Sequence, residues 1–388
     1  MPLLVLEATQ SVVQMGVVTA ITGVGQVVSG VFAGVIVDRA NRRRVMIGAD
    51  LGRMLLYLLL PACFWLGEPR LWQIYLAAGG VSLLGGLFSV AYLSAVANIV
   101  PLEDIGAANG SLQATQALTY VLGSVFAGAL SARFHPATAV AVNALSFGVS
   151  ALSLTKVRFQ RLRAEPSGAT SSGGPLAEIA TGIRFLFAER TLRALVLFQM
   201  AVALLASIGL SAAVIDLIVF RLRNELSRSA EAVGVSLGMA ALGAVLGAIA
   251  AAALQKRFGF GLLVVVGTAL QALGLLSCGF GRSWGYVTLG AAAWATGLTL
   301  RSVPANSVRQ TLTPDALLGR VTAASWTLVF GLSSVGALLI TRLAARVGAT
   351  LALRDAGVAL AIVCVLGFLS PLIAPSSLRS ARRSTLGG

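Results

Sequence analysis

Charged residues are scarce in this sequence. Asp, Glu, Lys and Arg together make up 11% of the 388 residues, whereas hydrophobic residues make up 57%. A soluble domain of this size has about a quarter charged residues, so this chain lacks the polar surface that water requires. The composition therefore excludes a soluble globular protein and predicts one whose solvent is the lipid bilayer.

Residue types that commonly carry enzyme chemistry are also rare. There is one histidine, His135, in a predicted short loop, and the three cysteines Cys63, Cys278 and Cys364 lie in separate apolar runs. This pattern predicts neither a disulfide framework nor a metal site. The sequence contains no nucleotide-binding loop and no nucleophile triad, so we expect neither an enzyme nor an ATP-driven pump, and no cofactor.

Acidic residues are fewer than basic ones. The 14 Asp and Glu residues are outnumbered by 29 Lys and Arg residues, which leaves a net charge of +15. In a soluble protein this excess would suggest nucleic-acid binding. Here the basic residues fall in short segments between apolar runs, as the positive-inside rule of membrane proteins describes. We therefore expect the lipid bilayer, and no nucleic acid, as a partner.

Long apolar runs are abundant. A helix needs about 20 apolar residues to cross the hydrocarbon layer, and eleven runs of that order are present. Two of them contain charges, since 45–67 carries Asp50 and Arg53 and 283–308 carries Arg301. The nine uncharged runs are 12–37, 71–100, 105–132, 136–155, 194–215, 232–254, 258–281, 321–341 and 356–378. The sequence predicts an all-α integral membrane protein with eleven full spans.

The segments between the runs indicate the orientation of the chain. Assigned alternately to two sides, they place 18 of the 29 Lys and Arg residues on one side and nine on the other. The positive-inside rule puts the richer side, which includes the C-terminal tail, in the cytoplasm. We expect a multi-pass protein of the plasma (inner) membrane with a cytoplasmic C-terminus.

An internal repeat divides the chain into two halves. A shift of 213 residues aligns Pro101 with Pro314 and the basic pair 43–44 with 256–257. Two related six-helix bundles are a known transporter plan, with the substrate site near the midplane between them. The predicted parts are an N-terminal bundle over 1–155, a cytoplasmic linker over 156–193, a C-terminal bundle over 194–378 and a basic cytoplasmic tail over 379–388.

The same repeat predicts that the first helix is mostly missing. The second half opens with the run 194–215, which continues to Phe220, and its counterpart would begin before residue 1. The end of that helix, Pro2 to Leu6, is all that remains, which suggests a misplaced start codon or a real truncation. A genuine eleven-span protein is the alternative.

A loop after the first complete span carries a family motif. Gly34-Val-Ile-Val-Asp38-Arg39-Ala-Asn-Arg42-Arg43 resembles the G-x-x-x-D-R-x-x-R-R loop of the major facilitator superfamily. Further local matches, among them PLEDIGAAN from Pro101 and RQTLTPDALLGR from Arg309, resemble the branch of macrolide, tetracycline and enterobactin exporters. The resemblance implies twelve spans in two bundles and, for most of that branch, export of amphipathic compounds in exchange for protons.

The resemblance also implies a gating role for this loop. Gly34 allows another helix to approach closely, and Asp38 can pair with Arg39, Arg42 or Arg43, or face a helix N-terminus. Such a charge cluster can latch the two halves on the cytoplasmic side in one state and release them in the other. The alternative is that the arginines only set the topology.

A second motif lies in the run 105–132. Gly123, Ser124 and Gly128 stand in a segment that resembles the G-x-x-x-G-P-x-x-G-G motif of the antiporters of this family, with Thr119 and Ala127 in place of two glycines. Ser124 replaces the proline, so the bend that proline causes is lost, while small residues still permit close helix packing. We expect this segment to pack against another helix, and the departure weakens the argument for export.

Charged residues inside spans are costly and mark candidate functional sites. Asp50 and Arg53 share one helical face, which predicts an ion pair near the cytoplasmic end, with gating as the alternative. Asp216 could carry a transported proton, or lie exposed in an outer vestibule. Arg301 could reach the cytoplasmic face, or bind an anionic group of a substrate.

Polar and aromatic residues inside spans complete the candidate substrate site. Amides and aromatic rings in an apolar cavity suit amphipathic ligands, although each such residue alone is more often a packing residue. These candidates are Gln113, Gln116, Gln199, Trp294 and Trp326.

The linker contains two parts of different character. EPSGATSSGG, starting at Glu165, has the composition of a flexible linker. Apolar residues then recur at helical spacing from Leu176 to Phe187, which predicts an amphipathic helix on the cytoplasmic surface.

These observations predict a monomeric secondary transporter. We expect proton-coupled export of an amphipathic small molecule by alternating access. The alternatives are a carrier of siderophore, lysolipid or another solute, an uptake carrier, and an inactive truncated membrane protein of this family.

Overall fold

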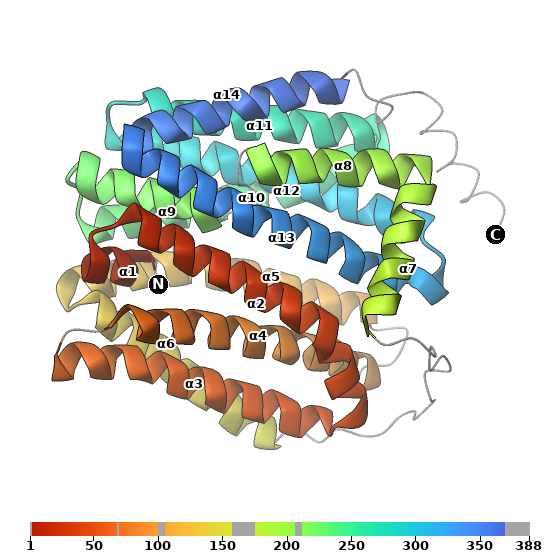
Figure 1. The fold of residues 1–388 in the computed structure, drawn as a ribbon, viewed down its shortest axis with the longest axis horizontal. Coiled ribbons are helices and arrows are strands. Elements are labelled where there is room, and N and C mark those ends of the chain that lie inside the picture. The colour runs from red at the N-terminus through yellow and green to blue at the C-terminus, as the bar shows by residue number, and fades with distance from the viewer. Residues whose placement is uncertain (1, 68–69, 100–104, 157–174, 206–211, 369–388) are drawn as a thin grey trace.

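The fold is entirely helical over the residues that the computed structural model describes, which are 2–67, 70–99, 105–156, 175–205 and 212–368. Figure 1 shows long helices running side by side, with α7 lying across one end. The helices are α1 (Pro2–Thr9), α2 (Val12–Arg39), α3 (Arg42–Leu66), α4 (Leu71–Ile99), α5 (Ile105–Arg133), α6 (Pro136–Lys156), α7 (Pro175–Ala188), α8 (Arg190–Leu205), α9 (Ala212–Phe220), the π-helix η2 (Arg221–Glu225), α10 (Ala230–Phe258), α11 (Phe260–Phe280), α12 (Trp284–Leu312), α13 (Asp315–Val347) and α14 (Ala349–Phe368).

The predicted repeat is visible in the packing. In the first half α4 packs on α2 and α3, and α3 packs on α6; in the second half α12 packs on α10 and α11, and α11 packs on α14. The bounds of α4, 71–99, shifted by 213 residues become 284–312, which are the bounds of α12. The chain therefore forms two pseudo-symmetric bundles, as predicted.

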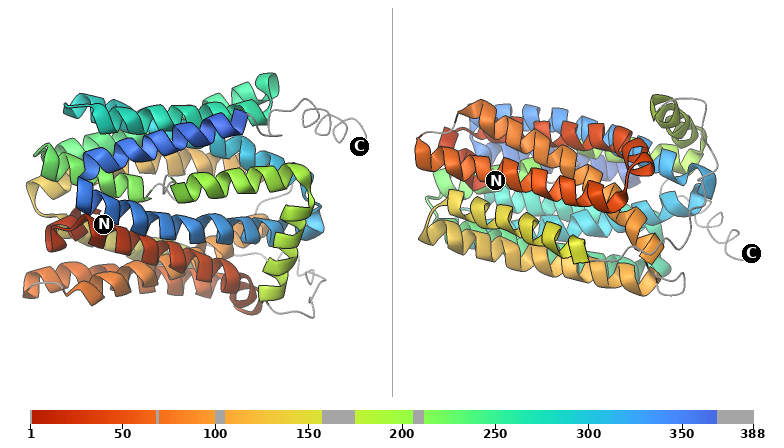
Figure 2. Two further views of the ribbon diagram at one scale, coloured as in Figure 1. Left: turned by 45° about the horizontal axis from the view of Figure 1, so that its top comes forward. Right: turned by 90° about the horizontal axis from the view of Figure 1, so that it is seen from below.

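The two bundles meet mainly along two pairs of helices, and α9 of the second half also touches α1 and α2 of the first. α2 packs against α13, and α5 packs against α10. Figure 2 shows from two further directions that the helices of both bundles stay roughly parallel. Each pair takes one helix from each half, so the space between the bundles is enclosed by both.

Eight helices are long and apolar enough to cross a membrane: α2, α3, α4, α6, α10, α11, α13 and α14. The other three predicted spans are α5, α12 and the pair α8 and α9, which is interrupted by residues outside the described ranges. The count of eleven full spans therefore stays a prediction.

One predicted boundary is wrong. The span expected from residue 356 begins at Ala349, directly after the single residue Gly348 that separates it from α13. Gly348 has a φ of +88°, a conformation that favours glycine and allows so short a turn. Arg354 and Asp355 had suggested a loop, but they pair with each other on the first turns of α14, where partly exposed charges are tolerated.

The bundles are closed at one end. We call the end that holds the turns at 134–135, 282–283 and 348 the outer end, following the predicted orientation. A Cβ on Gly16 in α2 would clash with Thr341 in α13, and one on Gly128 in α5 would lie 3.0 Å from the backbone nitrogen of Gly234 in α10. Both pairs of helices are thus in close contact near the outer end.

Further along the same helices, toward the cytoplasmic end, the space widens. No described atom lies within 4 Å of the Cβ position of Gly30 in α2 or of Gly331 in α13. The two halves are therefore in contact at one end and stand apart farther along the same helices.

The amphipathic segment of the linker forms α7, which packs on α13 and also touches α2. Its apolar residues Ile179 and Leu186 are buried in a cluster with Val321 and Ala324. The apolar face of α7 therefore rests on protein, and it connects the two halves at the cytoplasmic end.

Candidate functional site

A cavity of about 860 Å³ lies between the two bundles. Its walls come from α1, α2, α3 and α4 in the first half and from α9 and α13 in the second. Most of the lining is apolar or small, and the charged residues among those described are Arg53 and Asp216. The polar and aromatic lining residues are Thr19, Thr22, Gln26, Ser29, Tyr57, Ser82, Ser89, Trp326 and Phe330.

Asp216 is the acid of this cavity. It lies on α9 with 3% of its surface exposed, so the alternative of simple exposure in an outer vestibule does not hold. Its Oδ2 accepts a hydrogen bond of 2.5 Å from the hydroxyl of Thr19 on α2, in the opposite half. No basic side chain pairs with Asp216 among the described residues. A buried carboxyl with a neutral partner can exchange a proton without breaking an ion pair.

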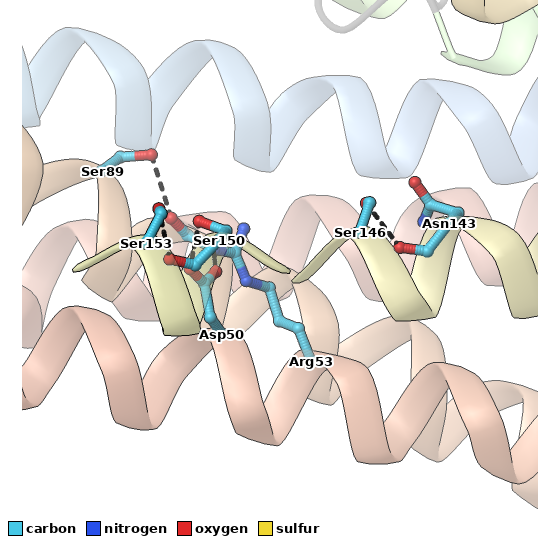
Figure 3. A network of polar contacts seen from close by, with 8 residues as sticks. Asp50, Arg53, Ser89, Asn143, Ser146, Ser150 and Ser153 are labelled. Carbon is cyan, nitrogen blue, oxygen red and sulfur yellow. Dashed lines mark hydrogen bonds and ion pairs between the residues drawn. The ribbon is translucent and has the colours of Figure 1, made fainter. Parts of the chain in front are cut away.

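Asp50 and Arg53 form an ion pair between neighbouring turns of α3, as the spacing indicated. Asp50 is fully buried, and its second oxygen accepts a hydrogen bond of 2.7 Å from Ser150 on α6. Figure 3 shows this pair facing the serines of α6, with Ser89 of α4 nearby. Both oxygens of Asp50 are thus satisfied, which a buried carboxylate requires.

Two aromatic rings hold the guanidinium of Arg53. Its Cζ lies 4.5 Å from the ring centroid of Phe88 on α4 and 4.5 Å from that of Phe147 on α6. Cation–π contact on both faces stabilises a cation away from water. Arg53 therefore joins α3, α4 and α6, and it reaches the cavity from within the first half.

Arg301 lies away from this cavity. It is 5% exposed on α12, and its Nε donates a 3.0 Å hydrogen bond to Gln271 on α11. The predicted reach to the cytoplasmic face is wrong, because Arg301 is buried against α11, where Gly267 leaves room beside it. Among the cavity-lining residues that the structure describes Arg301 is absent, so an anion site there gains no support.

The other polar candidates fall into three groups. Trp326 lines the cavity and packs on Phe330 with ring centroids 5.7 Å apart. Trp294 is 2% exposed in the core of the second half, and Gln199 is partly buried on α8, so neither is a lining residue of the described cavity. The side chains of Gln113 and Gln116 lie outside the described residues.

The gating loop is described in part. Gly34, Asp38 and Arg39 stand on the last turns of α2, and their side chains lie outside the described residues. Arg43 donates from its Nε to the carbonyl of Leu154 at 2.9 Å and from Nη2 to that of Thr155. A cation at these carbonyls satisfies the C-terminus of α6. Arg43 therefore ties α3 to α6 within one half, and the partially buried Arg42 remains a candidate for the latch.

Part of the small-residue motif of α5 packs against the other half. Gly128 and the backbone of Ser124 face Gly234 of α10 across the interface of the halves. Gly123 is exposed, and no described atom lies within 4 Å of its Cβ position. The expected packing role thus fits Gly128 and Ser124, and it is wrong for Gly123 because that residue points to another face of α5.

Sequence reasoning missed three residues that complete these sites: Thr19, Ser150 and Gln271. Each supplies the hydrogen-bond partner of a charged residue from a different helix. Hydroxyl and amide residues are common in membrane helices, so local sequence carries no signal that singles these out.

Comparison with known proteins agrees with this architecture. The sequence pattern of the Major Facilitator Superfamily matches residues 1–337. The enterobactin exporter EntS of Escherichia coli O1:K1 / APEC is 27% identical over 377 residues, which cover 94% of this chain and 85% of that protein. EntS of E. coli O6:K15:H31 (strain 536 / UPEC) is 28% identical over 379 residues, with the same coverage.

Solved structures of transporters share the fold. The nucleoside transporter NupG superposes with a TM-score of 0.72 at 10% identity, over 95% of this chain and 94% of NupG. A bacterial homologue of the human lysosomal transporter Spinster superposes with a TM-score of 0.71 at 14% identity, over 95% of this chain and 92% of that one.

Proposed function

Because this chain belongs to the Major Facilitator Superfamily, whose members are transporters, we propose that it exports amphipathic small molecules in exchange for protons. The observation that carries this proposal is the 860 Å³ cavity, which both halves line and which holds one carboxyl without a cationic partner among the described residues.

The lining of the cavity suits an amphipathic substrate. Cavities of about 300–1,000 Å³ accommodate drug-sized molecules when apolar walls carry a few polar groups. Tyr57, Trp326 and Phe330 offer ring faces to the apolar part. Thr22, Gln26 and Ser82 offer hydrogen-bonding groups to the polar part.

The interface between the bundles supports a mechanism of alternating access. The structure is closed where α2 meets α13 and α5 meets α10 at the outer end. If these contacts part and the halves approach each other at the cytoplasmic end, the cavity opens to the outside and closes to the cytoplasm. Gly34, Asp38, Arg39 and Arg42 are our candidates for the latch that forms at the cytoplasmic end in that state.

Asp216 is our candidate for the proton carrier. It lines the cavity, and Arg53, the other charged lining residue among those described, is neutralised by Asp50. The charge of the cavity therefore changes when Asp216 gains or loses a proton. An empty cavity with deprotonated Asp216 would attract a cationic substrate, and protonation of Asp216 would release it. The proton and the substrate would therefore bind in turn.

A siderophore is the second candidate substrate. It is favoured by the similarity to enterobactin exporters along 94% of this chain. The serine and threonine hydroxyls of the cavity also suit an oxygen-rich molecule.

Everted membrane vesicles test both candidates. Vesicles from a pump-deficient host that carry the full chain should accumulate rhodamine 6G when a proton gradient is imposed, and an uncoupler should abolish accumulation. Gradient-driven accumulation of enterobactin, measured in the same vesicles, would favour the siderophore. If neither compound accumulates, the proposal that this chain is an exporter is wrong. Uptake that the uncoupler does not change would contradict proton coupling.

An acidic residue outside the cavity provides the matched control. Asp216→Asn should reduce gradient-driven uptake at least tenfold, since the neutral amide carries no proton. Asp355→Asn should leave uptake unchanged, because Asp355 is about half exposed at the outer end, where it faces Arg354. Equal effects of the two substitutions would contradict the assignment of Asp216.

A further inference from the structure

We infer that Thr19 is a positioning residue that couples the protonation of Asp216 to the opening of the outer end. The inference rests on the proposed proton transport. It goes beyond that proposal because it assigns a role to a neutral residue of the opposite half.

The hydrogen bond between these residues joins the two bundles. Thr19 lies on α2 in the first half, and Asp216 lies on α9 in the second, 197 positions later in the chain. Both line the cavity, and Asp216 is almost fully buried. The bond therefore depends on how the halves sit against each other, and a hydroxyl on α9 itself would not have this property.

The hydrogen bond lies close to the contacts between the halves that must separate when the outer end opens. Thr19 lies seven residues after the start of α2 at Val12, about 10 Å below the outer end at 1.5 Å per residue. Gly16, one turn above Thr19, touches Thr341 of α13 in the other half. When the outer end opens, α2 moves away from α9 and α13, and the hydroxyl of Thr19 leaves Asp216.

The strength of the bond depends on the charge of Asp216. A hydrogen bond donated to an ionised carboxylate is roughly twice as strong as one between neutral groups. Ionised Asp216 therefore favours the closed outer end, where Thr19 is in reach, and protonation weakens that preference. By linkage, Asp216 binds its proton more readily when the outer end is open and releases it when that end is closed. This is the order that inward proton movement requires.

The described charged side chains near α9 are paired or lie near helix ends, and the α-amino group at the start of the chain also acts electrostatically on Asp216. On α1, Glu7 pairs with His135. On η2, Arg221 pairs with Glu225 and donates to the carbonyl of Gly281. On the other helices beside α9 and the cavity, Arg53 pairs with Asp50 on α3, and Arg354 pairs with Asp355 on α14. The remaining charged residues of these helices lie near helix ends: Asp38 and Arg39 on α2, and Asp315, Arg320, Arg342 and Arg346 on α13.

Spin labels across the outer end test the inference. Labels at Arg70→Cys and Arg282→Cys, which lie in outer turns of opposite halves, report opening in the full chain after the native cysteines are replaced by alanine. A His135→Gln background removes the histidine that faces Glu7 at this end. Between about pH 8 and about pH 5, the ratio of open to closed distances should rise about tenfold.

Variants of Thr19 separate positioning from packing. Thr19→Val keeps the shape and removes the donor, so the pH response of the distances should be lost, as in Asp216→Asn. Thr19→Ser restores the hydroxyl and should restore the response. A Thr19→Val protein that keeps the full response overturns the inference. So does a starting protein whose distances do not change with pH.

The proposal that Asp216 carries the proton can be tested separately from the role of Thr19. If Asp216→Asn stops proton-driven uptake while Thr19→Val keeps the pH response of the distances, Asp216 carries the proton without Thr19. If Asp216→Asn transports normally, the proton carrier itself is misassigned.

Discussion

The pair Asp50 and Arg53 shows how a membrane bundle accommodates opposite charges. The carboxylate is satisfied by Arg53 and Ser150, and the guanidinium lies between the rings of Phe88 and Phe147. Each partner alone would be a buried, uncompensated charge, which is far more costly than the pair. The pair therefore stabilises the first half, and its member Arg53 also lines the cavity.

We predict that Asp50→Asn destabilises the protein strongly. It leaves Arg53 without a counter-ion in the bundle, at a cost of about 3–5 kcal/mol for a broken buried pair. The melting temperature of the purified protein in detergent should fall, whereas Asp355→Asn should change it little because exposed pairs contribute about 0–1 kcal/mol. The double variant Asp50→Asn with Arg53→Gln should recover part of the loss, and a double variant no better than Asp50→Asn would contradict this account.

At the scale of helices, small residues determine where the bundles touch. Gly128 lies against Gly234 of α10, while Gly123, five residues earlier on the same helix, has open space around it. The two glycines are equivalent by composition and differ in the face of α5 on which they stand. Helix association in a bilayer depends on close packing, so one added side chain at the interface has a large effect.

We predict opposite outcomes for the same substitution at these two sites. Gly128→Val would drive its side chain into the backbone of α10 and should hold the outer end open, which labels at Arg70→Cys and Arg282→Cys would report as a longer distance. Gly123→Val should leave the distance unchanged. A closed outer end in the Gly128→Val protein would show that α5 and α10 do not form the contact that closes it.

At the scale of the whole molecule, α7 connects two bundles that otherwise meet mainly at α2 with α13 and α5 with α10. It packs its apolar residues on α13 and reaches α2 at the cytoplasmic end. A helix in this place restricts how far the halves can part at that end. The alternating movement that we propose must therefore carry α7 with α13, on which most of its buried residues rest.

The orientation of the whole molecule gives a further prediction. Basic residues predominate on the side that we assign to the cytoplasm. In intact cells, a cysteine introduced at the exposed Arg282 should react with a membrane-impermeant maleimide, and one at the exposed Arg44 should react only after permeabilisation. The reverse pattern would invert the topology, and with it the assignment of the closed end as the outer one.

The sequence alone determined the class of the molecule and its repeat. Run lengths and hydropathy predicted the long helices, and the described part of the run 71–100 forms α4 from its first residue to Ile99. These features follow from local composition, because an apolar run of sufficient length must form a helix in lipid. The spacing of Asp50 and Arg53 likewise predicted their pairing, because residues three apart share a helical face.

Tertiary structure decided which faces of the helices meet. The partner of Asp216 is a threonine in the other half, Arg301 turns toward Gln271, and Gly128 packs where Gly123 does not. In a soluble protein the polar side of a helix marks its exposed face, but lipid-facing and protein-facing surfaces in a membrane are equally apolar. Hydropathy therefore could not show which residues surround the cavity, and the packing of two bundles was needed to place Thr19 beside Asp216.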